Sequence, residues 1–340
     1  MKQRKPLRVL LLKLGTACNL GCPHCHQSQK NFVEHPRLVE WIKAQEFDRI
    51  TFSGGEPLMY FDTIKRIMTE VGKKPVYRMM SNGTLLSKEI AEFFNDYDVK
   101  YAISYDGKCG GRDLTVPIRW DNTKYLNKRG FGICTIFSDP QFSFRAFAKD
   151  IGGVMKENGI DCWTYPDFLK INWIHQTKDN PNPEFDQAVA DDYIKQVTHQ
   201  MDKLLWCFSC GEIEGHVVHT LIKRWYAKSS IKHGTACCNE IITNLNLDGT
   251  IMKCPYGTEV IGSIDNPPTN EVFDSFIPEK CKSCEYWDIC HCECVASVTG
   301  LDCYVNKTMI PTIRDLIKKH GVEKQVEELF QKPKFRNKVK

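Results

Sequence analysis

The chain has 340 residues, of which 42% are hydrophobic and 26% are charged, a composition typical of a globular protein with one large domain or two smaller ones. A net charge of +4 is too small to indicate a nucleic-acid partner. No apolar stretch approaches the roughly 18 residues that a membrane-spanning helix needs, so no membrane partner is expected.

Cysteine is the unusual component, with 17 residues. Disulfide-rich chains are short and secreted, whereas this chain is long and its cysteine count is odd, so metal ligation is the better interpretation. The apolar run after Met1 resembles a signal sequence, but Lys13 interrupts it and no small-residue cleavage site follows. We therefore expect a protein of the reducing cytoplasm.

Strand-like runs alternate with helical patterns through the first half of the chain. The predicted strands are Arg8–Leu14, Arg49–Ser53, Val76–Ser81, Tyr101–Tyr105, Gly132–Phe137 and Asp161–Tyr165. The predicted helices are Val33–Ala44, Phe61–Val71, Ser87–Asn95, Asn122–Lys128 and Ser143–Asn158. This alternation predicts an α/β fold with a parallel sheet, in which chemistry gathers at the carboxyl ends of the strands.

The second half of the chain has a different pattern. The Asn- and Pro-rich segment Asn180–Pro183 predicts a domain boundary. After it an apolar residue recurs at every fourth position, as on the core-facing side of a long helix: Phe185, Val189, Tyr193, Val197 and Met201. Residues 237–303 are rich in cysteines and turns, with Asp248-Gly249 as a hairpin signal. From Pro311 the pattern is helical and ends in a basic run, interpreted as a solvated end, at Lys332, Lys334, Arg336, Lys338 and Lys340.

Cys18, Cys22 and Cys25 follow the first predicted strand with the spacing Cys-x3-Cys-x2-Cys. Three such thiolates can each ligate one iron of a [4Fe–4S] cluster and leave the fourth iron open for a reactant. The alternatives are a zinc site or buried thiols. Zinc prefers paired cysteines and a fourth protein ligand, which would leave Cys18 unused, so we favour the cluster.

With Ser53-Gly54-Gly55-Glu56-Pro57 after the next strand, these cysteines resemble the motifs of the radical S-adenosylmethionine (SAM) superfamily. The resemblance implies a partial (β/α)6 barrel whose cluster chelates the amino and carboxylate groups of SAM. In that family an electron from an external one-electron reductant breaks a carbon–sulfur bond of SAM. The resulting 5′-deoxyadenosyl radical then abstracts a hydrogen atom from the substrate.

The same resemblance implies that the backbone of Gly54 and Gly55 and the side chain of Glu56 receive the SAM amino group, because a protonated amine needs acceptors. Ser104 is implied as a contact of the ribose hydroxyls. The remaining implied positions in or beside the SAM site are His24, Ser81, Asn82, Tyr105 and Asp106. His24 stands where the family has an aromatic residue near the adenine, and ligation of iron by His24 is a weaker alternative. Asp106 could equally be an ordinary turn residue.

A second array of cysteines resembles the SPASM extension of this superfamily, a seven-cysteine pattern that binds two auxiliary [4Fe–4S] clusters. One auxiliary cluster would be ligated by Cys281, Cys284, Cys290 and Cys303. The other would be ligated by Cys254, Cys294 and either Cys237 or Cys238. A rubredoxin-like or zinc-ribbon site is the alternative for the whole array.

The array departs from the family pattern because Cys237 and Cys238 are adjacent. The last ligand of that cluster could be the second of this pair, Cys207, Cys210 or the substrate. Cys207 and Cys210 could also be a redox pair, although buried thiols are slightly favoured. The cysteines without an expected role are Cys109, Cys134, Cys162 and Cys292.

The SPASM resemblance implies an enzyme that oxidatively modifies a ribosomally made peptide by forming a cross-link, since auxiliary clusters can accept the electron left on a product radical. A sulfatase maturase has an Asp after the Gly-x4-Cys cysteine, where this chain has Pro255 and Tyr256, which counts against formylglycine formation. The other hypotheses are a small-molecule dehydrogenase and a non-catalytic iron–sulfur or zinc protein.

Four segments are expected: a barrel over 1–180, a helical bridge over 181–236, the SPASM domain over 237–306 and a helix with a basic tail over 307–340. The cluster motif begins too early for a leader-binding domain at the amino end, so leader recognition would fall to a separate protein or to the tail. Position alone suggests six candidates for the general base: Tyr105, Asp106, Arg112, Tyr165, Asp167 and Tyr256.

Overall fold

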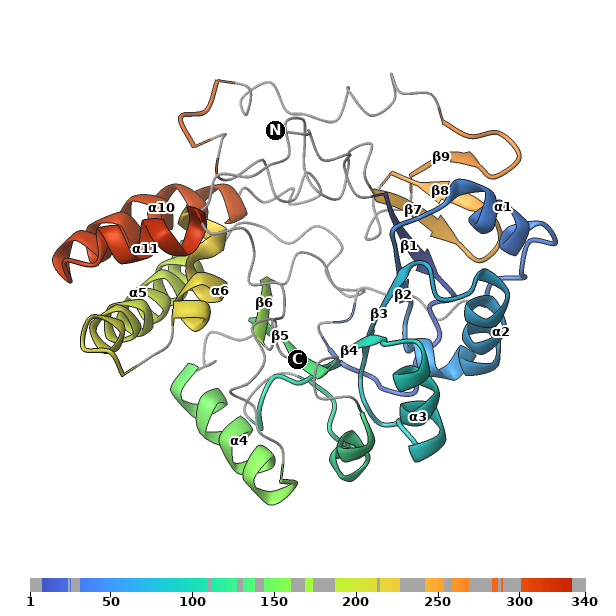
Figure 1. Cartoon of the computed structure of the whole chain (residues 1–340), viewed down its shortest axis with the longest axis horizontal. Coiled ribbons are helices and arrows are strands. Elements are labelled where there is room, and N and C mark those ends of the chain that lie inside the picture. The colour runs from blue at the N-terminus through green and yellow to red at the C-terminus, as the bar shows by residue number, and fades with distance from the viewer. Residues whose placement is uncertain are drawn as a thin grey trace. The chain divides into compact units, whose positions relative to one another are not determined.

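The computed structural model describes the following residues: 8–23, 25, 31–108, 112–126, 131–137, 144–159, 169–173, 187–212, 215–226, 242–253, 259–268, 283–286, 289 and 301–331. The chain divides into two compact units (Figure 1). The first unit comprises residues 1–142, 146–183 and 236–276. The second comprises residues 143–145, 184–235 and 277–340.

Six consecutive parallel strands form most of the sheet in the first unit. They are β1 (Val9–Lys13), β2 (Arg49–Ser53), β3 (Val76–Ser81), β4 (Lys100–Ser104), β5 (Phe131–Phe137) and β6 (Leu169–Trp173). Each pairs with the next one along the chain. The predicted α/β fold with a parallel sheet is therefore confirmed. The predicted sixth strand, Asp161–Tyr165, lies outside the described residues, and β6 follows that segment.

The helices of this unit are α1 (Leu38–Gln45), α2 (Phe61–Val71), α3 (Lys88–Asp96) and α4 (Phe144–Glu157), with short 3-10 turns η1 (Pro57–Tyr60) and η2 (Trp120–Tyr125). Ser87, the first residue of the predicted helix Ser87–Asn95, caps α3, because its hydroxyl accepts the Ile90 N–H at 3.2 Å. The predicted helix Val33–Ala44 begins too early, since Pro36 disfavours helical backbone at His35. The predicted helix at Asn122–Lys128 is replaced by η2.

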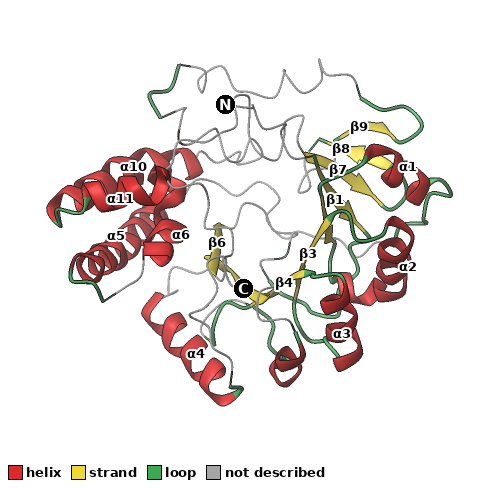
Figure 2. Cartoon of the chain, in the orientation of Figure 1, coloured by secondary structure: helices red, strands yellow, loops and turns green. Residues whose placement is uncertain are grey.

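Apolar side chains of α2 and α3 form the core on one side of the sheet. Figure 2 shows α1, α2 and α3 alongside β1–β4. Phe52 of β2 stacks on Tyr77 of β3 with ring centroids 6.0 Å apart, and both side chains are fully buried. Phe94 of α3 lies 5.7 Å from the ring of Tyr101 on β4. This packing holds the strands in register and so positions their carboxyl ends.

A hairpin from the cysteine-rich part of the sequence extends the same sheet. Strand β7 (Ile242–Asn246) pairs in parallel with β1, and β8 (Thr250–Met252) and β9 (Val260–Ser263) follow in antiparallel pairing. The predicted turn is confirmed: Asp248 accepts the N–H and the hydroxyl of Thr250 at 3.0 and 2.7 Å. Gly249 there has a φ of +84°, which favours glycine.

The second unit contains α5 (Gln187–Ser209), α6 (Gly215–Tyr226), α10 (Leu301–Lys319) and α11 (Glu323–Gln331). Three residues of the predicted apolar stripe, Tyr193, Val197 and Met201, are buried on α5, while the side chains of Phe185 and Val189 are outside the described part. Helix α5 contacts α10, which continues through Pro311. None of the helices in the described residues has a stretch long and apolar enough to cross a bilayer.

Candidate active site

The loop after β1 carries the first three cysteines and is closed at its base. Gly15 forms an isolated antiparallel bridge with Asn31, and the Tyr60 hydroxyl donates to the Asn31 side chain at 2.8 Å. A Cβ on Gly15 would lie only 2.1 Å from the Tyr60 oxygen, so the tyrosine packs directly on this glycine. Strand β1 and η1 thus hold the two ends of the loop together.

Cys18, Cys22 and Cys25 are free thiols in this loop. Cys22 is buried, and its carbonyl accepts the Cys25 N–H at 3.0 Å. Burial raises the pKa of the Cys18 thiol, and the negative charges of Glu56, Cys25 and Cys22 raise it further, while the Leu20 N–H opposes them. Bound iron would supply the positive charge that stabilises these thiolates.

Amide groups point at two of these sulfurs. The Leu20 N–H donates to the Cys18 sulfur at 3.4 Å, and the Asn82 side-chain amide lies 3.8 Å from the same sulfur. The Asp113 N–H donates to the Cys22 sulfur at 3.4 Å. Such donors are the outer contacts that orient thiolate ligands and tune their clusters, so the described residues fit a bound cluster.

A single-ion site is not indicated in the part of the chain that the structure describes. No three of its His, Cys, Asp or Glu side chains converge as the ligands of one metal ion. His24, which lies beside this loop in the sequence, is outside the described residues.

The carboxyl end of β2 lies directly against the cysteine loop. The Gly55 N–H donates to the Gly15 carbonyl at 3.1 Å, and the Glu56 N–H donates to the Ala17 carbonyl at 2.9 Å. A Cβ on Gly55 would lie 2.2 Å from the Ala17 oxygen and 2.4 Å from the Thr16 oxygen. Only glycine permits this approach, which explains why a Gly-Gly pair follows the strand.

Glu56 is a buried carboxylate, with 1% of its surface exposed. Its Oε1 accepts the Leu58 N–H at 2.9 Å and the Ser81 hydroxyl at 2.8 Å, and its Oε2 accepts the Asn82 N–H at 2.6 Å. Burial raises the pKa of this carboxyl, against the lowering effect of these three donors and of Arg112. A carboxylate offers about four lone pairs, so one acceptor position remains for a ligand.

Asn82 joins the end of β3 to the cysteine loop. Its side-chain nitrogen donates to the Asn19 oxygen at 2.8 Å, and its oxygen accepts the Thr84 hydroxyl at 2.7 Å. The Asn19 amide in turn donates to the Thr84 hydroxyl at 2.8 Å. Sequence reasoning missed Asn19, and it included Thr84 only as part of the segment from Ser81 to Thr84 that would line the SAM pocket. Their local sequences resemble turns, and the only signal was their position beside the Cys18 and Ser81-Asn82 motifs.

The end of β4 contributes a buried ion pair. Arg112 Nε lies 3.1 Å from Asp106 Oδ2, and its Nη2 donates to Oδ1 at 3.3 Å. Both side chains are almost fully buried, at 9% and 0% exposure. Tyr105 is also buried, with its ring edge-on to Trp120 at 5.4 Å, whereas Ser104 is only partly buried. The structure therefore places Asp106 and Tyr105 at the predicted strand end, in packed surroundings.

The other predicted ligands are only partly described. Cys284 and Cys303 are thiols of the second unit. The predicted auxiliary ligands outside the described residues are Cys237, Cys238, Cys254, Cys281, Cys290 and Cys294. The base candidates outside them are Tyr165, Asp167 and Tyr256. The auxiliary clusters and their number thus remain predictions.

Cys207 and Cys210 lie at the carboxyl end of α5. Cys207 is partly exposed and Cys210 is exposed, so the favoured prediction of two buried thiols is wrong: the end of the helix leaves them near the surface. Burial raises the pKa of the Cys207 thiol, and Glu212 raises it further. A raised pKa lowers the thiolate fraction, and the negative end of a helix dipole acts in the same direction. This position therefore does not activate Cys207 as a redox nucleophile. Cys134, which had no expected role, is buried in β5.

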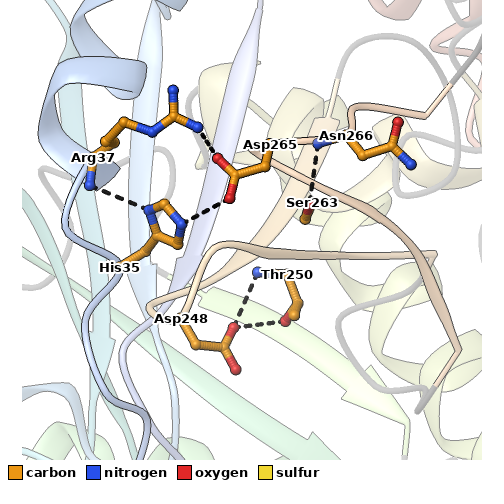
Figure 3. A network of polar contacts seen from close by, with 7 residues as sticks. All are labelled: His35, Arg37, Asp248, Thr250, Ser263, Asp265 and Asn266. Atoms are coloured by element: carbon orange, nitrogen blue, oxygen red, sulfur yellow. Dashed lines mark hydrogen bonds and ion pairs between the residues drawn. The ribbon is translucent and has the colours of Figure 1, made fainter.

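Figure 3 shows that His35 and Arg37, at the end of the cysteine loop, are joined to Asp265, which follows β9. His35 Nδ1 accepts the Arg37 N–H at 3.2 Å, so its Nε2 carries the proton and donates to Asp265 at 3.2 Å. Arg37 also pairs with Asp265, and the His35 N–H donates to the Leu247 carbonyl at 3.0 Å. The cysteine loop is thus fixed to the hairpin that precedes Cys254 in the sequence.

Curated relatives match limited parts of the chain. An uncharacterized protein of Methanocaldococcus jannaschii is 30% identical over 30% of this chain and 39% of its own length. The serine-type anaerobic sulfatase-maturating enzyme of Bacteroides thetaiotaomicron is 31% identical over 30% of each chain. Fe-coproporphyrin III synthase of Methanosarcina barkeri is 29% identical over 38% of this chain and 32% of its own length. The chain thus spans less than half of the length of each of these relatives.

Solved structures match more of the chain. The structure of anSMEcpe with bound AdoMet covers 96% of this chain and 98% of its own, with a TM-score of 0.65 at 18% identity. The same protein with AdoMet and the Cp18Cys peptide gives a TM-score of 0.65 at 19% identity, over 93% of this chain and 99% of its own. At this level of identity the likeness establishes a shared fold.

The family match covers the segment that contains the residues of the site. Residues 12–138, which run from β1 to the end of β5, match the Radical SAM superfamily. A match to this superfamily implies a [4Fe–4S] cluster and SAM as cofactors, and the thiols, the close approach at Gly55 and the Glu56 carboxylate described above fit both. The resemblance inferred from the Cys-x3-Cys-x2-Cys and Gly-Gly-Glu motifs is confirmed for residues 12–138, which contain a radical SAM domain.

Proposed function

We propose that this protein is a radical SAM enzyme of the SPASM type that oxidatively modifies a ribosomally made peptide by cross-link formation. In this proposal Cys18, Cys22 and Cys25 ligate the SAM-binding cluster. The bound cofactors would supply hydrogen-atom abstraction from an unactivated carbon. The partners are the peptide, an external one-electron reductant and a separate leader-binding protein.

One observation carries the catalytic part of the proposal. Loops from the ends of β1, β2 and β3 converge, and hydrogen bonds join Cys18 to Asn82 and Asn82 to Glu56. The Cys18 thiol and the partly filled Glu56 carboxylate thereby lie in one network at the carboxyl edge of a parallel sheet, and Cys22 and Cys25 lie in the same loop as Cys18. This edge is where barrel enzymes place their chemistry.

The residues of the site then have distinct roles. Glu56 Oε2 retains a lone pair for the SAM ammonium, and the Asn82 N–H orients that oxygen. The strand-end backbone at Gly54 and Gly55 supplies the other acceptors. Ser53 and Pro57 flank these residues at the end of β2 and the start of η1. Ser81 holds the second carboxylate oxygen of Glu56, and Ser104 contacts the ribose.

Asp106 has a different role from the one suggested by its position. A general base must reach the proton that it removes, whereas Asp106 is buried and paired with Arg112. We therefore propose that Asp106 orients the Arg112 guanidinium. The Arg112 charge lowers the pKa of Glu56 and so favours its ionised form.

The peptide substrate is supported by the likeness to anSMEcpe, which extends over nearly the whole chain and has been seen with bound peptides. Modification of a small molecule is the second candidate, and the partial similarity to Fe-coproporphyrin III synthase favours it. A sulfatase-maturase type of oxidation is compatible with the same fold. The predicted SPASM cysteines support an oxidative outcome, because auxiliary clusters can accept an electron.

Reductive SAM cleavage tests the catalytic part. The anaerobically reconstituted chain with dithionite and SAM should release 5′-deoxyadenosine, and Cys22→Ala should abolish the release. Cys134→Ala is the matched control, because Cys134 is also a buried cysteine but lies within β5. Release by Cys22→Ala equal to that of the parent would refute ligation by this motif.

The mass of the nearest encoded short peptide tests the substrate. After anaerobic co-expression with the parent chain, the peptide should lose a pair of hydrogens, and Cys22→Ala should leave its mass unchanged. Fragmentation then locates the new bond. An unchanged mass without deuterium uptake from solvent would refute peptide modification and direct the search to small molecules.

A further inference from the structure

The segment after β4, residues 112–119, fastens three strand ends together. Arg112 pairs with Asp106 at the end of β4, and the Arg119 N–H donates to the Gly83 carbonyl after β3 at 3.1 Å. Between these points Asp113 contacts the cysteine loop. We call residues 112–119 the strap.

Asp113 makes two contacts with the cysteine loop. Its Oδ2 accepts the Gly21 N–H at 2.8 Å, and its own N–H donates to the Cys22 sulfur at 3.4 Å. Its Oδ1 accepts the N–H and the hydroxyl of Thr115 at 2.9 and 2.6 Å, which fixes the carboxylate within the strap. Both oxygens are therefore engaged, one inside the strap and one across to the loop.

We infer that Asp113 is a positioning residue for the SAM-binding cluster: its carboxylate anchors the strap to the cysteine loop and so holds its N–H against the Cys22 sulfur. This inference rests on the proposed ligation of the cluster by Cys22. An N–H dipole aimed at a cluster sulfur stabilises the more negative, reduced state. The contact therefore raises the reduction potential of the cluster.

The negative charge of Asp113 lowers the reduction potential of the cluster, whereas its N–H raises that potential. Because the two effects differ in sign, the inference can be tested. A negative carboxylate near the cluster disfavours the added electron, so a purely electrostatic role predicts a higher potential when the charge is removed. The side chain is at the surface, where solvent and salt screen its charge. The anchored N–H lies in direct contact with the sulfur, so we expect its loss to dominate.

The variant Asp113→Asn separates the two effects. An asparagine is nearly isosteric but has one acceptor oxygen, so it cannot hold both Thr115 and Gly21. EPR-monitored titration of the SAM-sensitive signal should show a three- to tenfold lower ratio of reduced to oxidised cluster at a fixed potential, where tenfold is about 59 mV for one electron. Asp121→Asn, whose carboxylate pairs with Arg119, is the matched control and should keep the parent potential.

A second variant distinguishes a change in reduction potential from incomplete incorporation of the cluster. Thr115→Val keeps the charge of Asp113 and removes one of its two fixing contacts, so it should lower the potential by a smaller amount. In both variants, release of iron to a colorimetric Fe(II) chelator should be faster than in the parent chain. A potential that is unchanged or raised in both variants would overturn the inference.

Failure of the proposed cluster ligation can be distinguished from failure of the anchoring role of Asp113. If Cys22→Ala retains the SAM-sensitive EPR signal, the ligand assignment fails. If Cys22→Ala loses that signal while both strap variants keep or exceed the parent potential, only the anchoring role of Asp113 is refuted.

Discussion

Substitution of Gly55 by alanine is the sharpest test of how the site is built. The added Cβ would lie 2.2 Å from the Ala17 oxygen and 2.4 Å from the Thr16 oxygen, both of them backbone atoms. A rotamer change cannot relieve such a contact, so the cysteine loop must move away by about 1 Å to reach van der Waals distance. Ala17 directly precedes Cys18, so the first of the three proposed cluster ligands moves with it.

The energetic cost follows from the contacts at this point. A shift of about 1 Å would lengthen the 2.9 Å bond from the Glu56 N–H to the Ala17 carbonyl beyond hydrogen-bonding range. Leaving a buried donor unpaired costs about 1–3 kcal/mol, and overpacking costs a further 1–3 kcal/mol or so. The sum of about 2–6 kcal/mol is comparable with the smaller total stabilities of folded domains, so we expect local rearrangement of the loop with partial loss of stability.

Iron content per chain after anaerobic reconstitution, SAM cleavage and thermal unfolding would be measured on Gly55→Ala. We expect a lower melting temperature, loss of iron from the first site and at least a hundredfold loss of 5′-deoxyadenosine formation, since misplacement by 1 Å can cost about that much. Gly152→Ala on α4 is the matched control. Its Cβ would meet nothing within 4 Å, and alanine in a helix should be neutral or stabilising.

The reasoning would be refuted if Gly55→Ala bound iron and cleaved SAM at parent levels. Such a result would mean that the loop accommodates the methyl group without moving the ligand. The close approach of β2 to the cysteine loop would then be incidental to cofactor binding.

Two further predictions concern buried and half-buried carboxylates. Glu56→Gln should destabilise the fold by about 1–3 kcal/mol and weaken SAM binding at least tenfold, because an amide cannot accept from all three donors, including the Asn82 N–H. Calorimetric SAM affinity equal to that of the parent would contradict this role. Asp202→Asn should lower stability at neutral pH by about 0.5–1 kcal/mol, because Lys319 and His320 lower the pKa of Asp202 by hydrogen bonding. A carboxyl with a lowered pKa stabilises the fold above its ordinary pKa, so the difference between parent and variant should persist from about pH 7 to 5 and shrink only below about pH 4. Thermal unfolding across this range checks the sign, and a difference that grew in acid would refute it.

Much of the site was predictable because its signals are local. The cysteine spacing, the Gly-Gly-Glu motif and the bounds of β2 and β3 all arise from short stretches in which strand propensity, turn residues and ligand spacing agree. The Asp248-Gly249 turn was equally predictable from the sequence, since these two residues specify the hairpin. The predicted start of the first helix was wrong because the effect of Pro36 was overlooked, although it too was a local signal.

The contacts that join these motifs depend on distant parts of the chain. Asn19 meets Thr84, and Gly21 meets Asp113, only because parallel pairing brings the carboxyl ends of separate strands to one edge. The same holds for the pairing of β7 with β1, which could not be read from either strand alone because both are short apolar runs without a unique partner. Thus the sequence by itself determined the spacing of the three cysteines, the Gly-Gly-Glu motif and the match of residues 12–138 to the Radical SAM superfamily. The tertiary structure decided which backbone groups face the thiols, because the parallel pairing of distant strands, and no local preference, sets those distances.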